Sequence, residues 1–252
     1  MSVPLAVSPE RPFNIRYADE ALLVVEKPAG IVTEPGRGHS EDTLLNGLFH
    51  QYRTRLQRMW KARDWGLLHR LDRLTSGLLL VALKPEAYDA LRTQFENHRV
   101  RKRYWALVAG VPPRKQGTVQ QPLREIKGVR KRAVIGRDGK PATTAYRLLS
   151  SGTWREPRGR KRETTVSLLE IRPATGRLHQ VRVHMAHLGC PVLGDTWYGE
   201  QHPGPRMTRL GLHAAELSFV HPNLKRRLVV RAPWPEDLRS VLARCGLTEP
   251  ML

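Results

Sequence analysis

Residues 67–83 read LLHRLDRLTSGLLLVAL. One carboxylate, Asp72, lies between Arg70 and Arg73, directly before an apolar run. The run 77–83 is typical of a buried strand. The TSG before it favours a turn, so we expect HRLDR to form a loop or a strand edge rather than a helix. A charge beside a buried segment is costly unless it is paired or used. Asp72 is therefore a candidate functional residue.

Two interpretations of Asp72 remain open at this point. If HRLDR is extended, Arg70 and Asp72 point to the same side of the chain. A nearby cation typically lowers a carboxylate pKa by about 1–3 units, so Asp72 would stay ionised. It would then be a poor general acid but a competent nucleophile. A structural salt bridge or a turn cap is the commoner outcome for such a stretch taken alone.

The overall charge points to a polyanionic partner. Among 252 residues, 43 Lys and Arg face 23 Asp and Glu, a formal net charge of +20, while the hydrophobic content of 40% is that of a folded protein. A basic globular surface attracts polyanions. Nucleic acid is favoured over an anionic membrane as the partner, and a merely soluble basic surface is the third possibility.

The location of the protein is expected to be the cytoplasm. The two cysteines, Cys190 and Cys245, provide no disulfide framework and no zinc-ligand spacing, which fits a reducing compartment. The first residues lack the pattern of a signal peptide. The longest apolar run, 78–83, is too short to cross a membrane.

Strands and helices are mixed along the chain without regular alternation, which predicts an α+β fold. We expect a loose arm over residues 1–12 and one catalytic domain over 13–252. The expected strands cover 21–30, 77–83, 103–110, 143–150, 164–173 and two segments of the tail, and the expected helices cover 43–63, 85–100, 174–189 and the end of the chain. The basic stretches 113–140 and 151–163 are expected to be exposed loops.

A second cluster of basic residues surrounds a predicted loop-to-helix junction. RPATGRLHQVRVH contains Arg172, Arg177, His179, Arg182 and His184. A helix N-terminus beside arginines can receive a phosphate or a carboxylate. Thr175 could cap this helix and Gly189 could end it.

Other kinds of site have less support. His179 and His184 would lie roughly 140° apart on a helix, and no cysteine or acidic cluster completes a site with His187, so we expect no metal. No glycine-rich phosphate loop is present, which leaves nucleotide cofactors without support. Asp72 also has no evident second carboxylate of the kind that glycosidases use.

Tyr104 opens a predicted strand directly after the run RVRKR. An aromatic ring beside basic residues can serve as a base-stacking platform. A core tyrosine is the more frequent outcome at such a position.

Taken together, these segments resemble the pseudouridine synthases of the large-subunit type A (RluA) family. The pair HRLDxxTSG and GRxHQxRVH, in this order, is highly specific. The matching pieces are KPAG at 27–30, HRLDRLTSGLLLVAL at 69–83, KRYWALVAG at 102–110, GKPATTAYRLL at 139–149, RPATGRLHQVRVHMAHLGCPVLGD at 172–195 and LHAAELSFVHP at 212–222.

The resemblance implies a mixed, largely antiparallel sheet with flanking helices and a central RNA-binding cleft. It also implies isomerisation of uridine to pseudouridine in transfer or ribosomal RNA, without a metal or another cofactor. The family's catalytic aspartate falls on Asp72, its base-stacking tyrosine on Tyr104, and the arginine that pairs with the carboxylate on Arg177. Arg70 is of the kind that fills the space left by a flipped base. A monomer would suffice.

Two departures from the family pattern bear on the substrate. Thr33-Glu34-Pro35-Gly36 stands where members often have a histidine before Pro-Gly, and Leu178 stands where a polar residue is frequent. We expect no separate N-terminal RNA-binding domain, and we expect the basic stretches 113–140 and 151–163 to hold RNA instead.

The side chains expected to contact RNA are basic or imidazole groups near these motifs. They are His69, Arg70, Arg73, Arg101, Lys102, Arg103, Arg130, Lys131, Arg132, Arg158, Arg160, Lys161, Arg162, Arg172 and His179. An inert RNA-binding protein on the same fold is the alternative, but binding alone would not require Asp72, Tyr104 and Arg177 together.

Overall fold

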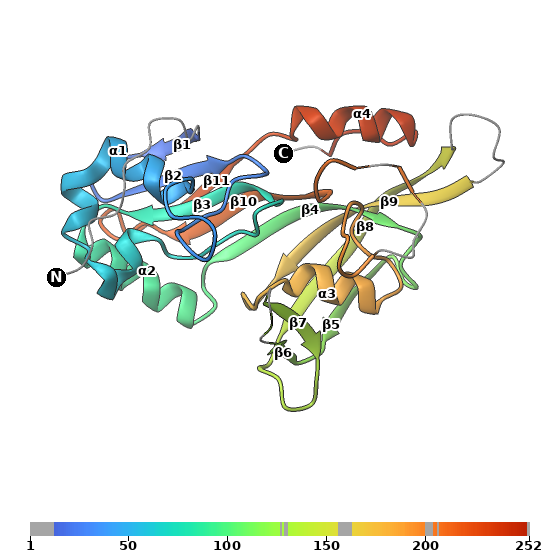
Figure 1. The fold of residues 1–252 in the computed structure, drawn as a ribbon, viewed down its shortest axis with the longest axis horizontal. Helices are drawn as coiled ribbons and strands as arrows, with labels where there is room; N and C mark the ends of the chain where they lie inside the picture. Colours follow the sequence, from blue (N-terminus) through green and yellow to red (C-terminus); the bar gives the residue numbers. More distant parts are fainter. Residues whose placement is uncertain are drawn as a thin grey trace. The chain divides into compact units, whose positions relative to one another are not determined.

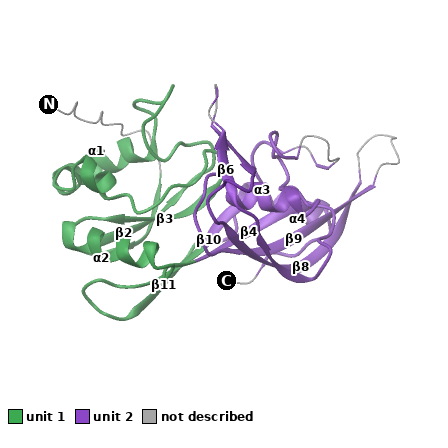
Figure 2. Ribbon diagram, turned by 90° about the horizontal axis from the view of Figure 1, so that it is seen from below, with its two compact units in different colours: residues 1–101, 216–232 green, residues 102–215, 233–252 purple. Residues whose placement is uncertain are grey.

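The computed structural model describes residues 13–126, 128, 131–155, 163–199, 204–205 and 207–250. The expected arm over residues 1–12 lies outside them. The chain forms two compact units (Figure 2), one of residues 1–101 and 216–232 and one of residues 102–215 and 233–252. The single catalytic domain expected from the sequence over residues 13–252 stays a prediction.

Unit 1 contains the segment 67–83 and most of the helices. Its elements are β1 (Asn14–Ala18), β2 (Leu22–Lys27), α1 (Leu44–Gln57), a 3₁₀ helix (Lys61–Gly66), β3 (Ser76–Ala82), α2 (Pro85–Glu96), the last part of β10 (Leu212–Val220) and β11 (Arg227–Arg231). The strands follow the order β1-β2-β3-β10, and β11 pairs with β10. The pairings of β1 with β2, β2 with β3 and β10 with β11 are antiparallel.

The apolar runs explain why β2 and β3 lie at the centre of this unit. All residues of β3 are buried, and Val24 of β2 lies opposite Leu80 of β3. Strands that are covered on both faces show such continuous apolar sequences. Phe219 and Leu91 belong to the same buried cluster, so β10 and α2 complete the core.

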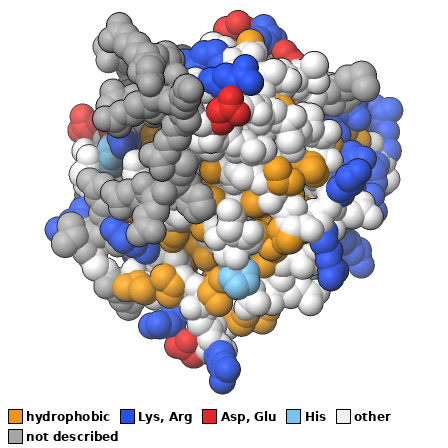
Figure 3. All heavy atoms as spheres, turned by 90° about the vertical axis from the view of Figure 1, so that its right-hand side faces the viewer, with side chains coloured by type: hydrophobic (Ala, Val, Ile, Leu, Met, Phe, Trp, Pro, Cys, Tyr) orange, Lys and Arg blue, Asp and Glu red, His pale blue; other side chains and the backbone are white. Residues whose placement is uncertain are grey.

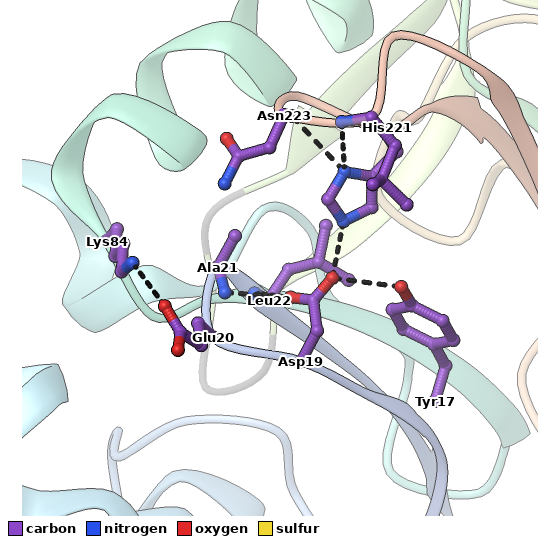
Figure 4. A network of polar contacts seen from close by, with 9 residues as sticks. Tyr17, Asp19, Glu20, Ala21, Leu22, Lys84, His221 and Asn223 are labelled. Carbon is purple, nitrogen blue, oxygen red and sulfur yellow. Dashed lines mark hydrogen bonds and ion pairs between the residues drawn. The ribbon is translucent and has the colours of Figure 1, made fainter.

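A polar network fixes the turn between β1 and β2 (Figure 4). Asp19 accepts hydrogen bonds from the backbone N–H groups of Ala21 and Leu22 at 2.7 and 2.9 Å. The hydroxyl of Tyr17 donates to the same carboxylate, and Nε2 of His221 lies 2.6 Å from it. Burial alone would raise the pKa of Asp19, but these hydrogen bonds outweigh it and hold the pKa below its usual value.

Unit 2 is built on long strands (Figure 1). Its elements are β4 (Arg101–Ala109), β5 (Gln116–Gln120), β6 (Leu123–Ile126), β7 (Arg132–Ile135), β8 (Thr143–Arg155), β9 (Glu163–Pro173), α3 (Gln180–His187), the first part of β10, and α4 (Glu236–Arg244). The strands follow the order β10-β4-β9-β8-β5, and β6 and β7 form a separate antiparallel pair. The pairs β4–β9, β8–β9 and β5–β8 are antiparallel.

α3 packs on one face of this sheet and α4 on the other. Gln180 and His184 of α3 bond Thr144 of β8 on one face. Trp105 of β4 belongs to a buried cluster with Leu238 of α4. Because neighbouring residues of a strand point to opposite faces, Tyr104 faces the α3 side and Trp105 faces the α4 side.

The predicted fold class is confirmed: the protein is α+β, with a mixed, largely antiparallel sheet. Several local predictions were wrong. Residues 113–140 contain the strands β5, β6 and β7 rather than loops alone, α1 ends at Gln57, and α3 begins only at Gln180. Part of 151–163 belongs to β8 and β9, and its residues 156–162 lie outside the described part. No helix among the described residues is long and apolar enough to span a membrane.

Candidate active site

The turn at residues 27–30 is tied to the loop that carries Asp72. The buried Lys27 ammonium donates to the carbonyl oxygens of Pro28 and Ile31, both at 2.8 Å, and of Arg73 at 3.3 Å. The N–H of Gly30 also donates to the Arg73 carbonyl, at 2.7 Å. Gly30 has φ +92°, a conformation that side chains other than glycine rarely adopt, which explains why KPAG ends in glycine.

Thr33 forms a second tie to the same loop. Its buried hydroxyl donates to the Leu71 carbonyl at 2.9 Å and accepts from the Leu71 N–H at 3.2 Å. A side chain thus satisfies both polar backbone groups of the residue before Asp72. The Thr33 position, which the sequence analysis connected with the substrate, therefore also has a structural role.

Asp72 itself lies at the start of a turn, as predicted from TSG. Its carbonyl accepts a hydrogen bond from the N–H of Thr75 at 3.0 Å, and β3 begins at the next residue. The Asp72 side chain is half-buried. This position lets the carboxylate reach a ligand while the backbone on both sides is held.

The neighbours of Asp72 have different surroundings. The Arg70 guanidinium pairs with Glu34, and the Arg70 side chain is 67% exposed. Arg73 is exposed. The half-buried His69 accepts from the backbone N–H of Leu80 at 3.2 Å, so its ring helps to hold the loop on β3.

In unit 2, β4 presents Tyr104 on the face that α3 covers. Tyr104 lies opposite Ile171 of β9 and is buried to 9% exposure. Lys102, two residues earlier on the same face, donates to the Thr175 carbonyl at 3.2 Å. Burial lowers the pKa of Lys102 to about 8, so at pH 7 most of this lysine is protonated.

The loop that carries Arg177 is organised by the side chain of Gln180. Its Oε1 accepts from the Thr175 hydroxyl at 2.6 Å and from the Arg177 N–H at 3.0 Å. Its Nε2 donates to the Thr143 carbonyl and the Thr144 hydroxyl, both at 2.9 Å. Thr175 was expected to cap the helix. It bonds Gln180 instead, and α3 starts after the left-handed residue His179.

The Arg177 guanidinium is exposed, and its Nε donates to the Pro141 carbonyl at 3.2 Å. Its backbone N–H is already bonded to Gln180. The exposed group of Arg177 is therefore its guanidinium, because its backbone N–H is already used. An anion would meet the Arg177 side chain first.

A buried ion pair between Arg182 of α3 and Asp195 holds the helix in place. Arg182 donates from Nε and one terminal nitrogen to Asp195 at 2.7 and 2.9 Å. Asp195 also accepts from the N–H groups of Trp197 and Tyr198. The Tyr198 hydroxyl lies 2.9 Å from Nδ1 of His179, so this network positions His179, one of the side chains expected to contact RNA.

His179 and His184 both form hydrogen bonds with protein groups. His184 is buried between the Thr144 hydroxyl and the Gln121 carbonyl, and burial lowers its pKa. Within the described ranges, no group of three or more His, Cys, Asp or Glu side chains could hold a metal ion.

The predicted RNA-binding side chains divide into several groups. Arg101 and Lys131 are exposed, and the Arg132 guanidinium lies 5.2 Å from the centroid of the Trp197 ring. Arg103 and Arg172 lie on the sheet face opposite to Tyr104. Arg130, Arg158, Arg160, Lys161 and Arg162 lie outside the described residues. Lys and Arg side chains also gather along one edge of the face in Figure 3.

Asp72 belongs to unit 1, and Tyr104 and Arg177 belong to unit 2. Within unit 2, Tyr104 and the 175–177 loop share one sheet face, because Lys102 on that face contacts Thr175. Sequence reasoning missed Lys27, Thr33 and Gln180 as supports of the site. Lys27 and Gln180 lie in the motifs KPAG and GRLHQ, which could have marked them as candidates. The residues that Lys27, Thr33 and Gln180 bond are distant in sequence, so the sequence did not reveal these contacts.

Comparisons with known proteins agree with these motifs. The family model described as RNA pseudouridylate synthase matches residues 21–187. An "uncharacterized RNA pseudouridine synthase" of Chloroflexus aurantiacus is 42% identical over 217 residues, 86% of this chain and 64% of that protein. The "ribosomal large subunit pseudouridine synthase D" of Nitrosomonas europaea is 36% identical over 238 residues, 92% of this chain and 64% of that protein. The chain thus spans less than two thirds of the length of these two relatives.

Solved structures show the same fold. The structure titled "Human RNA Pseudouridylate Synthase Domain Containing 4" has a TM-score of 0.70 and 24% identity, and the match covers 94% of each chain. "Human RNA Pseudouridylate Synthase Domain Containing 1" has a TM-score of 0.65 and 26% identity, over 96% of this chain and 98% of that one.

Proposed function

The chain belongs to the RNA pseudouridylate synthase family, and we propose that it isomerises uridine to pseudouridine in RNA, with Asp72 as the catalytic carboxylate. The observation that carries the proposal is the anchoring of the HRLDR loop. Lys27 and Thr33 hold the backbone on both sides of Asp72, yet its side chain stays partly accessible. Catalytic groups require such support from their surroundings.

The reaction balances without an external reductant or oxidant. The bond between C1′ and N1 of the uridine breaks, the freed uracil turns, and C5 forms a bond to C1′. C5 loses its hydrogen as a proton, and N1 gains a proton. Asp72 assists the first step, either by attacking the sugar or by removing a sugar proton.

The target uridine must first leave its stack, at a cost of a few kcal/mol. We infer that Arg70 fills the space that the base leaves, since its guanidinium is largely exposed. Tyr104 then stacks on the extruded base, because it lies on the face that also holds the Arg177 loop. Arg177 is the arginine that we propose for the family's carboxylate-binding role, since its side chain is exposed.

Ribosomal RNA is the substrate class that we propose first. The Nitrosomonas europaea relative is named for the large ribosomal subunit. The net charge of +20 favours binding to a polyanion such as ribosomal RNA. The proposed enzyme works as a monomer in the cytoplasm.

Nucleoside analysis of the product tests this function. Large-subunit ribosomal RNA and transfer RNA, both transcribed in vitro, are incubated separately with the protein and digested. The proposal predicts pseudouridine without free uracil in the ribosomal RNA. Free uracil would indicate a hydrolase. Unchanged uridine in both RNAs, with binding intact, would favour an inert RNA-binding protein.

A further inference from the structure

A second basic surface lies on the face of the unit 2 sheet that is turned away from Tyr104. Glu170 of β9 lies opposite Arg147 of β8 and opposite Trp105 of β4, so these side chains share one face. Arg172 of β9, two residues further along, points to the same side. Arg103 points there as well, because it precedes Tyr104 on β4.

The Glu170 carboxylate pairs with all three arginines of this surface. Glu170, with a side chain only 6% exposed, lies 3.0 Å from Arg172, 3.3 Å from Arg147 and 3.7 Å from Arg103. The cluster therefore has a net charge of about +2 at neutral pH. A buried carboxylate fixes the guanidinium groups in place, which lowers the entropy that a ligand must remove.

Two of these guanidinium groups remain open to a ligand. The side chains of Arg147 and Arg172 are 56% and 63% exposed. Each contact with Glu170 uses one terminal nitrogen, whereas a guanidinium has five N–H donors. Glu170 repels an anion but is shielded by the guanidinium groups in front of it.

The arginines border an open hollow of about 500 Å³. Gln116 and Thr118 of β5 also line it, because they lie opposite Arg147 and Ala145. The small side chain of Ala145 leaves room between the polar groups. Two arginines with amide and hydroxyl donors suit phosphate oxygens, since planar guanidinium groups bind phosphate with two parallel hydrogen bonds.

We propose that this hollow binds the sugar-phosphate backbone of the RNA substrate, as a surface separate from the face that holds Tyr104 and Arg177. This inference rests on the proposed function for one point, that the bound polyanion is RNA. β5 forms the end of the sheet, so an RNA that reaches both faces passes around the edge of β5. The hollow would thus hold RNA that lies beyond the target uridine.

The test compares variants of equal charge. R147Q/R172Q removes two charges at the hollow, and the control R239Q/R244Q removes two on α4. Binding to transcribed ribosomal RNA is measured by fluorescence anisotropy from 0.05 to 0.3 M salt. For the hollow variant we expect the slope of log K against log salt to fall by about 1.4–1.8, and affinity at 0.1 M salt to weaken roughly 10- to 50-fold. R147K/R172K should keep most of the slope.

The variants also separate binding from catalysis. At saturating RNA, R147Q/R172Q should turn over at the wild-type kcat with a raised KM. A slope and an affinity equal to those of R239Q/R244Q would overturn the proposal. If the wild type bound RNA through the hollow but formed no pseudouridine, the proposed function would fail and this inference would stand.

A measurement on the wild type guards against a variant that does not fold. Arginine modification with phenylglyoxal, read by peptide mass spectrometry, should be at least several-fold slower at Arg147 and Arg172 when RNA is bound. Arg244 should react equally with and without RNA. Equal reactivity of Arg147 and Arg172 in both states would overturn the proposal.

Discussion

Thr33→Val tests how the loop of Asp72 is held. Valine has nearly the shape of threonine, but it lacks the hydroxyl that donates to the Leu71 carbonyl and accepts from the Leu71 N–H. Both Thr33 and Leu71 are buried, at 2% and 8% exposure, so water does not easily replace the hydroxyl. The substitution therefore leaves one donor and one acceptor without their partner.

The expected loss follows from these two hydrogen bonds. Each is worth about 0.5–1.5 kcal/mol net, and a buried polar group left without a partner costs about 1–3 kcal/mol. The extra apolar contact of valine offsets less than about 1 kcal/mol. We expect Thr33→Val to lower the free energy of unfolding by about 2–4 kcal/mol.

Urea unfolding followed by circular dichroism measures this loss, as a lower midpoint with an unchanged slope. Thr33→Ser is the matched control, since it keeps the hydroxyl and loses one methyl group worth about 0.8 kcal/mol. We also expect Thr33→Val to lower kcat while the affinity for RNA stays the same. A loss below about 1 kcal/mol, or equal losses for the two variants, would show that the Thr33 hydroxyl does not hold the loop.

Three further predictions concern the titratable groups. Asp19→Asn should destabilise the protein by about 1.5–3 kcal/mol at pH 7. Because the folded pKa of Asp19 lies below its usual 3.8, the urea midpoints of wild type and variant should converge below about pH 4. A difference in midpoint that stays constant with pH would contradict this. Acylation of Lys102, followed by peptide mass spectrometry, should show a midpoint near pH 8, whereas a midpoint near 10.5, as in exposed lysines, would argue against its burial. Asp195→Ala leaves Arg182 as a buried charge and should cost about 3–5 kcal/mol in thermal or urea unfolding, so a loss under 1 kcal/mol would count against this ion pair.

β2 and β3 could be predicted from the sequence because they are buried and therefore consist mainly of apolar residues. The run 77–83 became β3, and ALLVVEK became β2. The strands β5, β6 and β7 could not be found in the same way. Their residues are mostly exposed, so they lack the apolar pattern on which such predictions depend.

The boundaries of α3 depended on a contact that the sequence does not reveal. Thr175 is of the type that caps helices, but its hydroxyl donates to the Gln180 side chain. Thr143 and Thr144 of β8 accept hydrogen bonds from the same Gln180 side chain and so hold it in this position. Local patterns cannot supply such information.

For the site, the motifs predicted which residues carry chemistry but not what supports them. Asp72 was singled out as the one carboxylate before an apolar run. Its supports Lys27 and Thr33 lie 46 and 38 residues from their partners in the loop. Strand alternation could have separated Arg103 from Tyr104 in advance, because adjacent residues of a strand face opposite ways.

Release of tritium from RNA labelled at C5 of uridine tests whether the protein forms pseudouridine through Asp72. Wild type and Asp72→Asn are compared on ribosomal RNA and on transfer RNA, after circular dichroism and anisotropy have shown equal folding and RNA binding. We expect the wild type to release tritium from ribosomal RNA and Asp72→Asn to release none. Release by Asp72→Asn at the wild-type rate, or no release by the wild type from either RNA, would contradict it.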